Sequence, residues 1–66
     1  MSTLSRTDRK ILALLQKDGR MSVAEIGRQV GLTASPCAER IRRLEKQGII
    51  TGYFARLAPA KLDAGL

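Results

Sequence analysis

Residues 22–46 read SVAEIGRQVGLTASPCAERIRRLEK, and this stretch decides the fold. Ser22 and Glu25 have the spacing of a capping box, in which each residue satisfies a free amide at the start of a helix. Apolar residues then recur at helical intervals as far as Gly31, which tolerates the left-handed backbone of a helix end. The pattern therefore predicts a short helix over residues 23–30.

A second helix is predicted from Ala34 to about Gln47. Thr33 is suited to cap its start, and Pro36 is tolerated in its first turn because the amide that proline lacks has no helical partner there. Gly48 is expected to end this helix.

Two helices joined by such a tight turn are typical of a helix-turn-helix, which here would extend over about residues 23–42. A glycine inside a helix costs about 1 kcal/mol relative to alanine, so close approach of the two helices is a physical reason for Gly27. An ordinary helical hairpin with the same glycines remains the alternative for this pattern.

The helix that begins at Ala34 is expected to have one apolar and one basic face. Its apolar residues are Cys37, Ile41 and Leu44, which should meet Ile26, Leu15 and Leu12. The opposite face carries Ser35, Glu39, Arg42, Arg43 and Lys46, with Arg40 and Gln47 on one flank and Ala38 on the other. A polar, basic face of this kind is what a helix needs to read the major groove of DNA.

We assign candidate contacts along this face by their distance from the start of the helix, whose first turns reach base edges in groove-docked proteins. Glu39 is ambiguous: it can accept from a cytosine amino group or pair with Arg42 or Arg43, and we favour the pairing. The candidates for base contacts are Ser35, Pro36, Ala38, Glu39 and Arg42. The candidates for phosphate contacts are Arg28, Thr33, Arg40, Arg43 and Lys46.

Composition agrees with a polyanionic partner. The 66 residues carry 12 Lys and Arg against six Asp and Glu, a net charge of +6, which favours a polyanionic partner without separating DNA from RNA or an anionic membrane. Cys37 is the only cysteine and histidine is absent, so we expect no disulfide, metal site, cofactor or enzyme activity. No signal peptide or membrane span is expected, and the cytoplasm is the predicted location.

The flanking segments complete an all-α, three-helix, winged-helix-like domain with a short C-terminal strand. Ser5 and Asp8 have capping-box spacing ahead of a helix predicted over residues 6–17. Residues 49–57 are enriched in residues that suit a strand or wing. Residues 58–66 have too little apolar periodicity for a second domain and resemble the start of a linker.

Four stretches resemble the Lrp/AsnC regulators, also called leucine-responsive or feast/famine regulatory proteins. Leu4–Leu12, followed by Leu15–Arg20, is similar to their first helix, Val30–Glu45 to their turn and recognition helix with its Ser-Pro-Cys step, and Gly48–Tyr53 to the exit into their connecting strand. Ser5 stands where that family usually has Asp, and Thr7 where it has an aliphatic residue. These departures weaken the first-helix cap and packing, and leave the recognition helix unchanged.

The resemblance implies a DNA-binding domain over residues 1–57 and a linker from residue 58 to a C-terminal α/β domain that is absent here. In that family the absent domain binds amino acids and forms dimers and higher oligomers. The expected partners are therefore double-stranded DNA and a second copy of the full-length protein, with the effector bound outside this chain. A protein-binding winged helix is the main alternative function, and RNA binding is a weaker one.

Overall fold

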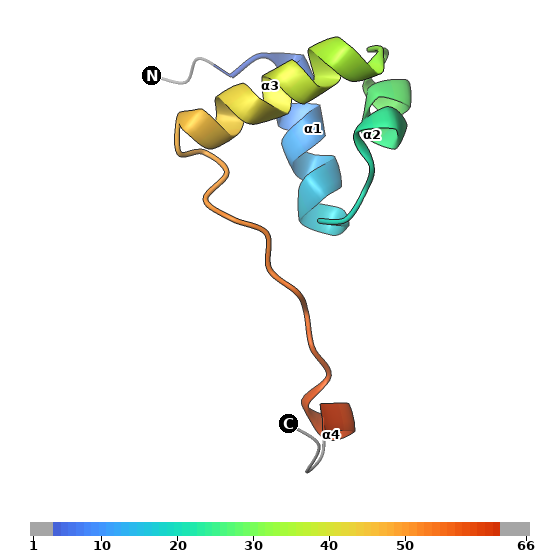
Figure 1. The fold of residues 1–66 in the computed structure, drawn as a ribbon, viewed down its shortest axis with the longest axis vertical. Coiled ribbons are helices and arrows are strands. Elements are labelled where there is room, and N and C mark those ends of the chain that lie inside the picture. The colour runs from blue at the N-terminus through green and yellow to red at the C-terminus, as the bar shows by residue number, and fades with distance from the viewer. Residues whose placement is uncertain (1–3, 63–66) are drawn as a thin grey trace.

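The computed structural model describes residues 4–62 of the chain. The helices within this range are α1 (Arg6–Lys17), α2 (Val23–Val30), α3 (Ala34–Lys46) and α4 (Pro59–Leu62). The first three form a bundle in which α3 crosses over α1 and α2, while the chain after α3 leads away from it (Figure 1). The three helices predicted from the sequence are confirmed, and α4 was not predicted.

The start of α1 is a complete capping box, as the sequence predicted. The Ser5 hydroxyl accepts from the backbone N–H of Asp8 at 3.0 Å, and the Asp8 carboxylate accepts from the N–H of Ser5 at 3.2 Å. At the start of α2, Ser22 accepts from the N–H of Glu25 at 3.1 Å, but the Glu25 side chain accepts from Arg28 and Gln29 and not from the N–H of Ser22, so only half of the predicted capping box forms. Thr33 takes the N-cap position of α3, but its side chain makes no capping hydrogen bond.

The geometry of the turn between α2 and α3 explains why positions 27 and 31 are both glycine. Gly31 has a φ of 79°, in the left-handed region that was predicted for it. Gly27 is buried, and the N–H of Leu32 donates to its carbonyl at 2.7 Å. A Cβ on Gly27 would lie 2.5 Å from the Leu32 carbonyl oxygen. The close approach that requires glycine is therefore made by the backbone of the turn as it folds back on α2.

Each of the three helices contributes at least one buried residue to the core. These residues are Ile11, Ile26, Cys37 and Leu44. Leu12, Leu15 and Ile41, which the sequence placed in the same cluster, are partly buried and pack against it. Because α3 contributes Cys37 and Leu44, its apolar face is turned inward and its basic face outward.

The strand predicted over residues 49–57 is absent, and residues 4–62 contain no strand. Gly48 ends α3 with a φ of 77°, and the N–H groups of Ile49 and Ile50 donate back to the Leu44 carbonyl. A strand requires a second strand for its backbone hydrogen bonds, and residue preferences alone do not supply one. We call residues 49–57 the exit segment.

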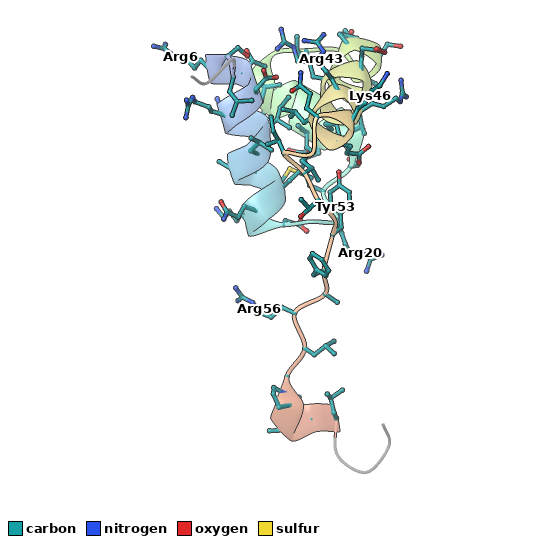
Figure 2. The ribbon with its side chains drawn as sticks, turned by 90° about the vertical axis from the view of Figure 1, so that its left-hand side faces the viewer. Arg6, Arg20, Arg43, Lys46, Tyr53 and Arg56 are labelled. Atoms are coloured by element: carbon teal, nitrogen blue, oxygen red, sulfur yellow. The ribbon has the colours of Figure 1, made fainter. Side chains whose placement is uncertain are left out.

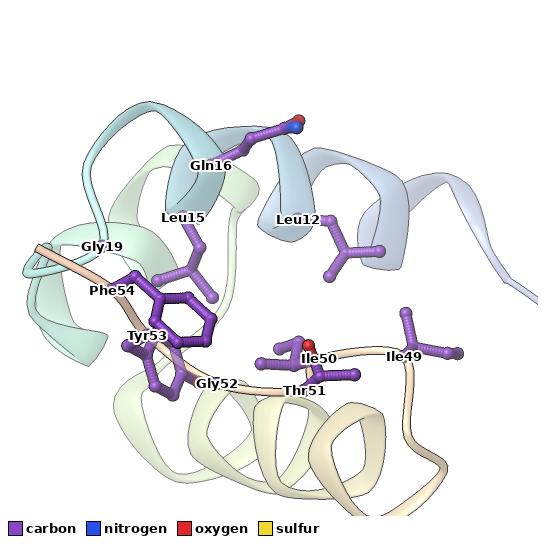
Figure 3. A pocket seen from close by; sticks show the side chains of 10 residues that line it. All are labelled: Leu12, Leu15, Gln16, Gly19, Ile49, Ile50, Thr51, Gly52, Tyr53 and Phe54. Atoms are coloured by element: carbon purple, nitrogen blue, oxygen red, sulfur yellow. The ribbon is translucent and has the colours of Figure 1, made fainter. Parts of the chain in front are cut away.

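The exit segment first runs beside α1. Leu12 and Leu15 of α1 face Ile50, Tyr53 and Phe54 across a hollow of about 500 Å³ (Figure 3). Beyond it the segment leaves the bundle and reaches α4. None of the helices within residues 4–62 is long and apolar enough to cross a membrane.

Candidate nucleic-acid interface

The outward face of α3 presents a row of exposed polar and basic side chains. Arg43 and Lys46 extend away from the bundle at its upper edge (Figure 2). Neither forms an ion pair with a carboxylate in the described part of the chain, so both positive charges face solvent. The exposed members of this face are Ser35, Glu39, Arg42, Arg43 and Lys46, as the helical spacing predicted.

The residues predicted to contact bases lie along the first half of α3. Ser35 and Pro36 are exposed in its first turn, and Ala38 is half-buried one turn further on. These small side chains leave the backbone of α3 accessible from outside. The geometry therefore brings four of the five candidates to one open surface, with Ala38 at its margin.

Glu39 and Arg42 form the intrahelical pair that the sequence favoured. The Arg42 guanidinium donates to the Glu39 carboxylate at 3.3 Å, and the two side chains are 70% and 65% exposed. Exposed ion pairs contribute little free energy because water and salt screen them. Arg42 can therefore leave Glu39 for a guanine edge or a phosphate at small cost.

Arg28 lies on α2 and is exposed, as a phosphate contact requires. Its guanidinium is paired with the Glu25 carboxylate, which also accepts from the Gln29 side chain at 3.0 Å. Hydrogen bonds from Gln29 and then from Arg28 lower the pKa of Glu25. Glu25 therefore stays ionised beside Arg28 and partly neutralises it, while Thr33, also a phosphate candidate, is exposed at the start of α3.

Arg40 does not join the open surface, although the sequence predicted a phosphate contact for it. Its guanidinium points to the start of α1, where it donates to the Asp8 carboxylate at 3.1 Å and to the Ser5 hydroxyl at 3.2 Å. Burial raises the pKa of Asp8, but hydrogen bonds from Ser5 and Arg40 and the charge of Arg40 outweigh burial and lower it overall. Asp8 is therefore a carboxylate held in its charged form.

Sequence reasoning missed this interhelical pair because its members are 32 residues apart. One signal was available: Asp8 falls on the same side of α1 as Ile11 and Leu15, and a carboxylate on an apolar face needs a cationic partner. Arg40, on the flank of the apolar stripe of α3, satisfied that requirement.

A second missed contact connects the exit segment with the end of α3. The Tyr53 hydroxyl donates to the Glu45 carboxylate at 2.7 Å. Partial burial, the hydrogen bond and the negative charge of Glu45 together raise the pKa of Tyr53 to about 12. This hydrogen bond fastens the exit segment to the last turns of α3.

Comparison with known proteins indicates a DNA-binding domain. A family model described as winged helix-turn-helix DNA-binding matches residues 4–51. The leucine-responsive regulatory proteins of Salmonella typhimurium and Escherichia coli K12 are 59% identical over 63 residues, which are 96% of this chain and 38% of each relative. The chain thus spans less than half the length of the relatives it matches.

Solved structures give the same result. A transcriptional regulator from Neisseria meningitidis, crystallised as an L-Met complex, superposes with a TM-score of 0.88 at 43% identity, covering 96% of this chain and 41% of that one. An AsnC family regulator from Agrobacterium tumefaciens gives 0.84 at 42% identity, over 91% and 39%. These matches favour DNA binding over the protein-binding alternative.

Proposed function

Because this chain belongs to the winged helix-turn-helix DNA-binding family and to its Lrp/AsnC branch, we propose that it binds duplex DNA by placing α3 in the major groove. The observation that carries this proposal is the orientation of α3. Cys37 and Leu44 are buried behind the helix, while Arg42, Arg43 and Lys46 are exposed in front of it.

The start of α3 supplies the base contacts in this proposal. Small first-turn residues let the helix backbone approach the groove, and a freed Arg42 is long enough to donate to guanine O6 and N7. The proposed base-contacting residues are Ser35, Pro36, Ala38, Glu39 and Arg42.

Phosphates on either side of the groove are contacted by the outer cations. Arg43 and Lys46 are the strongest candidates because no carboxylate among residues 4–62 neutralises them. Arg28 and Thr33 complete the proposed set, in which Arg28 exchanges Glu25 for a phosphate.

In the full-length protein this unit serves an amino-acid-responsive regulator of transcription in the bacterial cytoplasm. The proposal is supported by relatives named as leucine-responsive and by a structural neighbour solved with L-Met. Residues 58–66 then begin the linker to an effector domain, and positions 63–66 lie outside the described residues. Two copies place their α3 helices in successive major grooves about 34 to 36 Å apart.

A salt titration tests the DNA contact. We expect the logarithm of the affinity for a short duplex to fall linearly with the logarithm of salt concentration, and Arg43→Ala or Lys46→Ala to reduce that slope by about 0.9 each. Lys17→Ala is the matched control, because it removes one positive charge at the end of α1 that is remote from α3 (Figure 1). If all three variants changed the slope equally, α3 would not be the DNA-contacting helix.

A further inference from the structure

The contact between Arg40 and Asp8 joins the recognition helix to α1. It links a side chain in the middle of α3 to the first turn of α1 through a 3.1 Å ion pair, with Ser5 as a second acceptor at 3.2 Å. By contrast, the pairs Arg28–Glu25 and Arg42–Glu39 each lie within one helix. Only a contact between helices can affect how α3 is set relative to α1.

Burial makes this contact stronger than the exposed pairs. The side chains of Arg40 and Asp8 are 32% and 11% exposed, against 70% and 65% for Arg42 and Glu39. Removing one partner of a buried pair leaves the other charge without compensation, which costs more than breaking an exposed pair. Arg40 is therefore held by Asp8 more firmly than Arg42 is held by Glu39.

The hydrogen bonds of Arg40 restrain the rotation of α3 more closely than the apolar core does alone. The apolar contacts of Cys37 and Leu44 determine which face of α3 is turned inward, but they are non-directional, so they restrain small rotations about the helix axis less than a directed hydrogen bond does. Arg40 lies at the edge of the apolar face, and the positions of Asp8 and Ser5 are themselves fixed by the capping box. The pair therefore ties the rotation of α3 to a rigid point on α1.

We propose that Arg40 is a positioning residue of the DNA interface, which acts through Asp8 and contacts no phosphate. The pair sets the rotation of α3 that turns Arg42 and Arg43 toward the groove. This inference rests on the proposed DNA-binding function. It has an unusual consequence: removing the negative charge of Asp8 should weaken binding to DNA, although the protein becomes more positive.

A double-mutant cycle on the whole 66-residue chain tests this proposal, with affinity for a mixed-sequence duplex measured by fluorescence anisotropy over a range of salt concentrations. The variants are Arg40→Gln, Asp8→Asn and the double substitution. Asparagine is chosen because its side-chain oxygen can still accept from the N–H of Ser5, so the cap is kept. Arg43→Ala provides the reference for a lost phosphate contact.

We expect each single variant to lose about fivefold in affinity with an unchanged salt slope, and the double variant to lose no more than either single one. Arg43→Ala should instead reduce the slope by about 0.9. Val23→Ala, which removes partly buried apolar surface from α2, controls for stability: at a temperature where circular dichroism shows every variant folded, it should bind like the unmodified chain.

Four outcomes would overturn the proposal. A slope reduced by about 0.9 in Arg40→Gln would make Arg40 a phosphate contact, and tighter binding by Asp8→Asn would show that only its charge matters. Unchanged affinity in both variants, with the expected loss in Arg43→Ala, would reject the positioning role while leaving the proposed function intact. Failure of the unmodified chain to bind the duplex at low salt would reject both.

Discussion

At Gly27 in α2, the backbone of the turn that follows the helix leaves no room for a side chain. Alanine favours a helix over glycine by about 1 kcal/mol, so propensity alone predicts that Gly27→Ala stabilises the domain. The Leu32 carbonyl oxygen, 2.5 Å from the position of the new methyl group, reverses that expectation because it belongs to backbone that cannot rotate away. We expect Gly27→Ala to destabilise the fold by about 2 kcal/mol, measured by urea denaturation.

Gly19 is the matched control for this prediction. A Cβ there would meet only the Leu15 carbonyl oxygen, at an ordinary 3.8 Å. Gly19→Ala should therefore be neutral or slightly stabilising, because it reduces the conformational freedom of the unfolded chain. Equal effects of the two substitutions would show that the turn yields to the methyl group at Gly27.

Tyr53 provides a pH-dependent prediction at the same scale. It is the only tyrosine, so the ultraviolet absorbance of tyrosinate reports its ionisation directly. In the folded chain we expect a midpoint near pH 12, and we expect Glu45→Gln to lower it because the negative charge that opposes ionisation is removed. Partial burial remains in this variant, so its midpoint should stay above the ordinary value of 10.

The raised pKa of Tyr53 also determines the pH range in which its contact with Glu45 contributes to stability. The pKa is higher in the folded than in the unfolded chain, so the contribution is fully present below pH 10 and is lost as the pH rises toward 12. In concentrated denaturant both proteins should titrate near 10. Identical midpoints for the two folded proteins would mean that Glu45 does not accept from Tyr53 in solution.

At the scale of elements, the three N-caps make a graded prediction. Ser5→Ala and Ser22→Ala each remove a hydroxyl that accepts a backbone N–H, which should cost about 1 kcal/mol of unfolding free energy. Thr33→Ala should cost much less, because the Thr33 side chain makes no capping hydrogen bond. Thermal melts of the three variants would check the order, and an equal loss in Thr33→Ala would contradict it.

What the sequence predicted at this scale depended on local signals. Capping boxes, glycine stops and apolar periodicity lie within a few residues of one another, and they predicted α1, α2 and α3 correctly. The prediction of a strand over residues 49–57 was wrong because residue preference for a strand is a local property, whereas a strand also needs a partner strand from elsewhere in the chain. The helix α4 is only four residues long, too short for periodicity to reveal it.

In the candidate site, too, some residue positions follow from the local sequence and others depend on how the elements pack. The exposure of Arg42, Arg43 and Lys46 follows from the helical repeat of α3 and was predicted. The inward turn of Arg40 depends on Asp8, and the position of Glu45 against Tyr53 depends on the path of the exit segment. Both require knowledge of how the elements are packed, which no single helical wheel contains.

At the scale of the whole molecule, the chain combines a compact bundle with an extended tail. Its radius of gyration is 14.5 Å, whereas a compact chain of this length would have about 11 Å. The difference arises from the residues after Tyr53, which lead away from the helices (Figure 1). Phe54 is 88% exposed, so even its aromatic ring adds little to the core.

We therefore expect a chain ended after Tyr53 to fold as stably as the whole one, within about 0.5 kcal/mol. Small-angle scattering should give it a radius of gyration near 10 Å. A chain ended after Gly48 is the control, because it also loses Ile50 from the core periphery and two N–H donors to the Leu44 carbonyl. It should be clearly less stable. A large loss already in the longer chain would show that the tail packs on the bundle.

Because Cys37 is buried, the rate at which it is alkylated reports how often α3 detaches from the bundle. Its side chain is fully enclosed between the helices, and burial raises the pKa of its thiol. The thiolate is the nucleophile that attacks an alkylating reagent and displaces its halide, so Cys37 can react only while α3 is briefly detached from its neighbours. Because there is no other cysteine, the rate at which iodoacetamide is consumed counts these detachments, and a bound duplex should slow that rate in proportion to its occupancy.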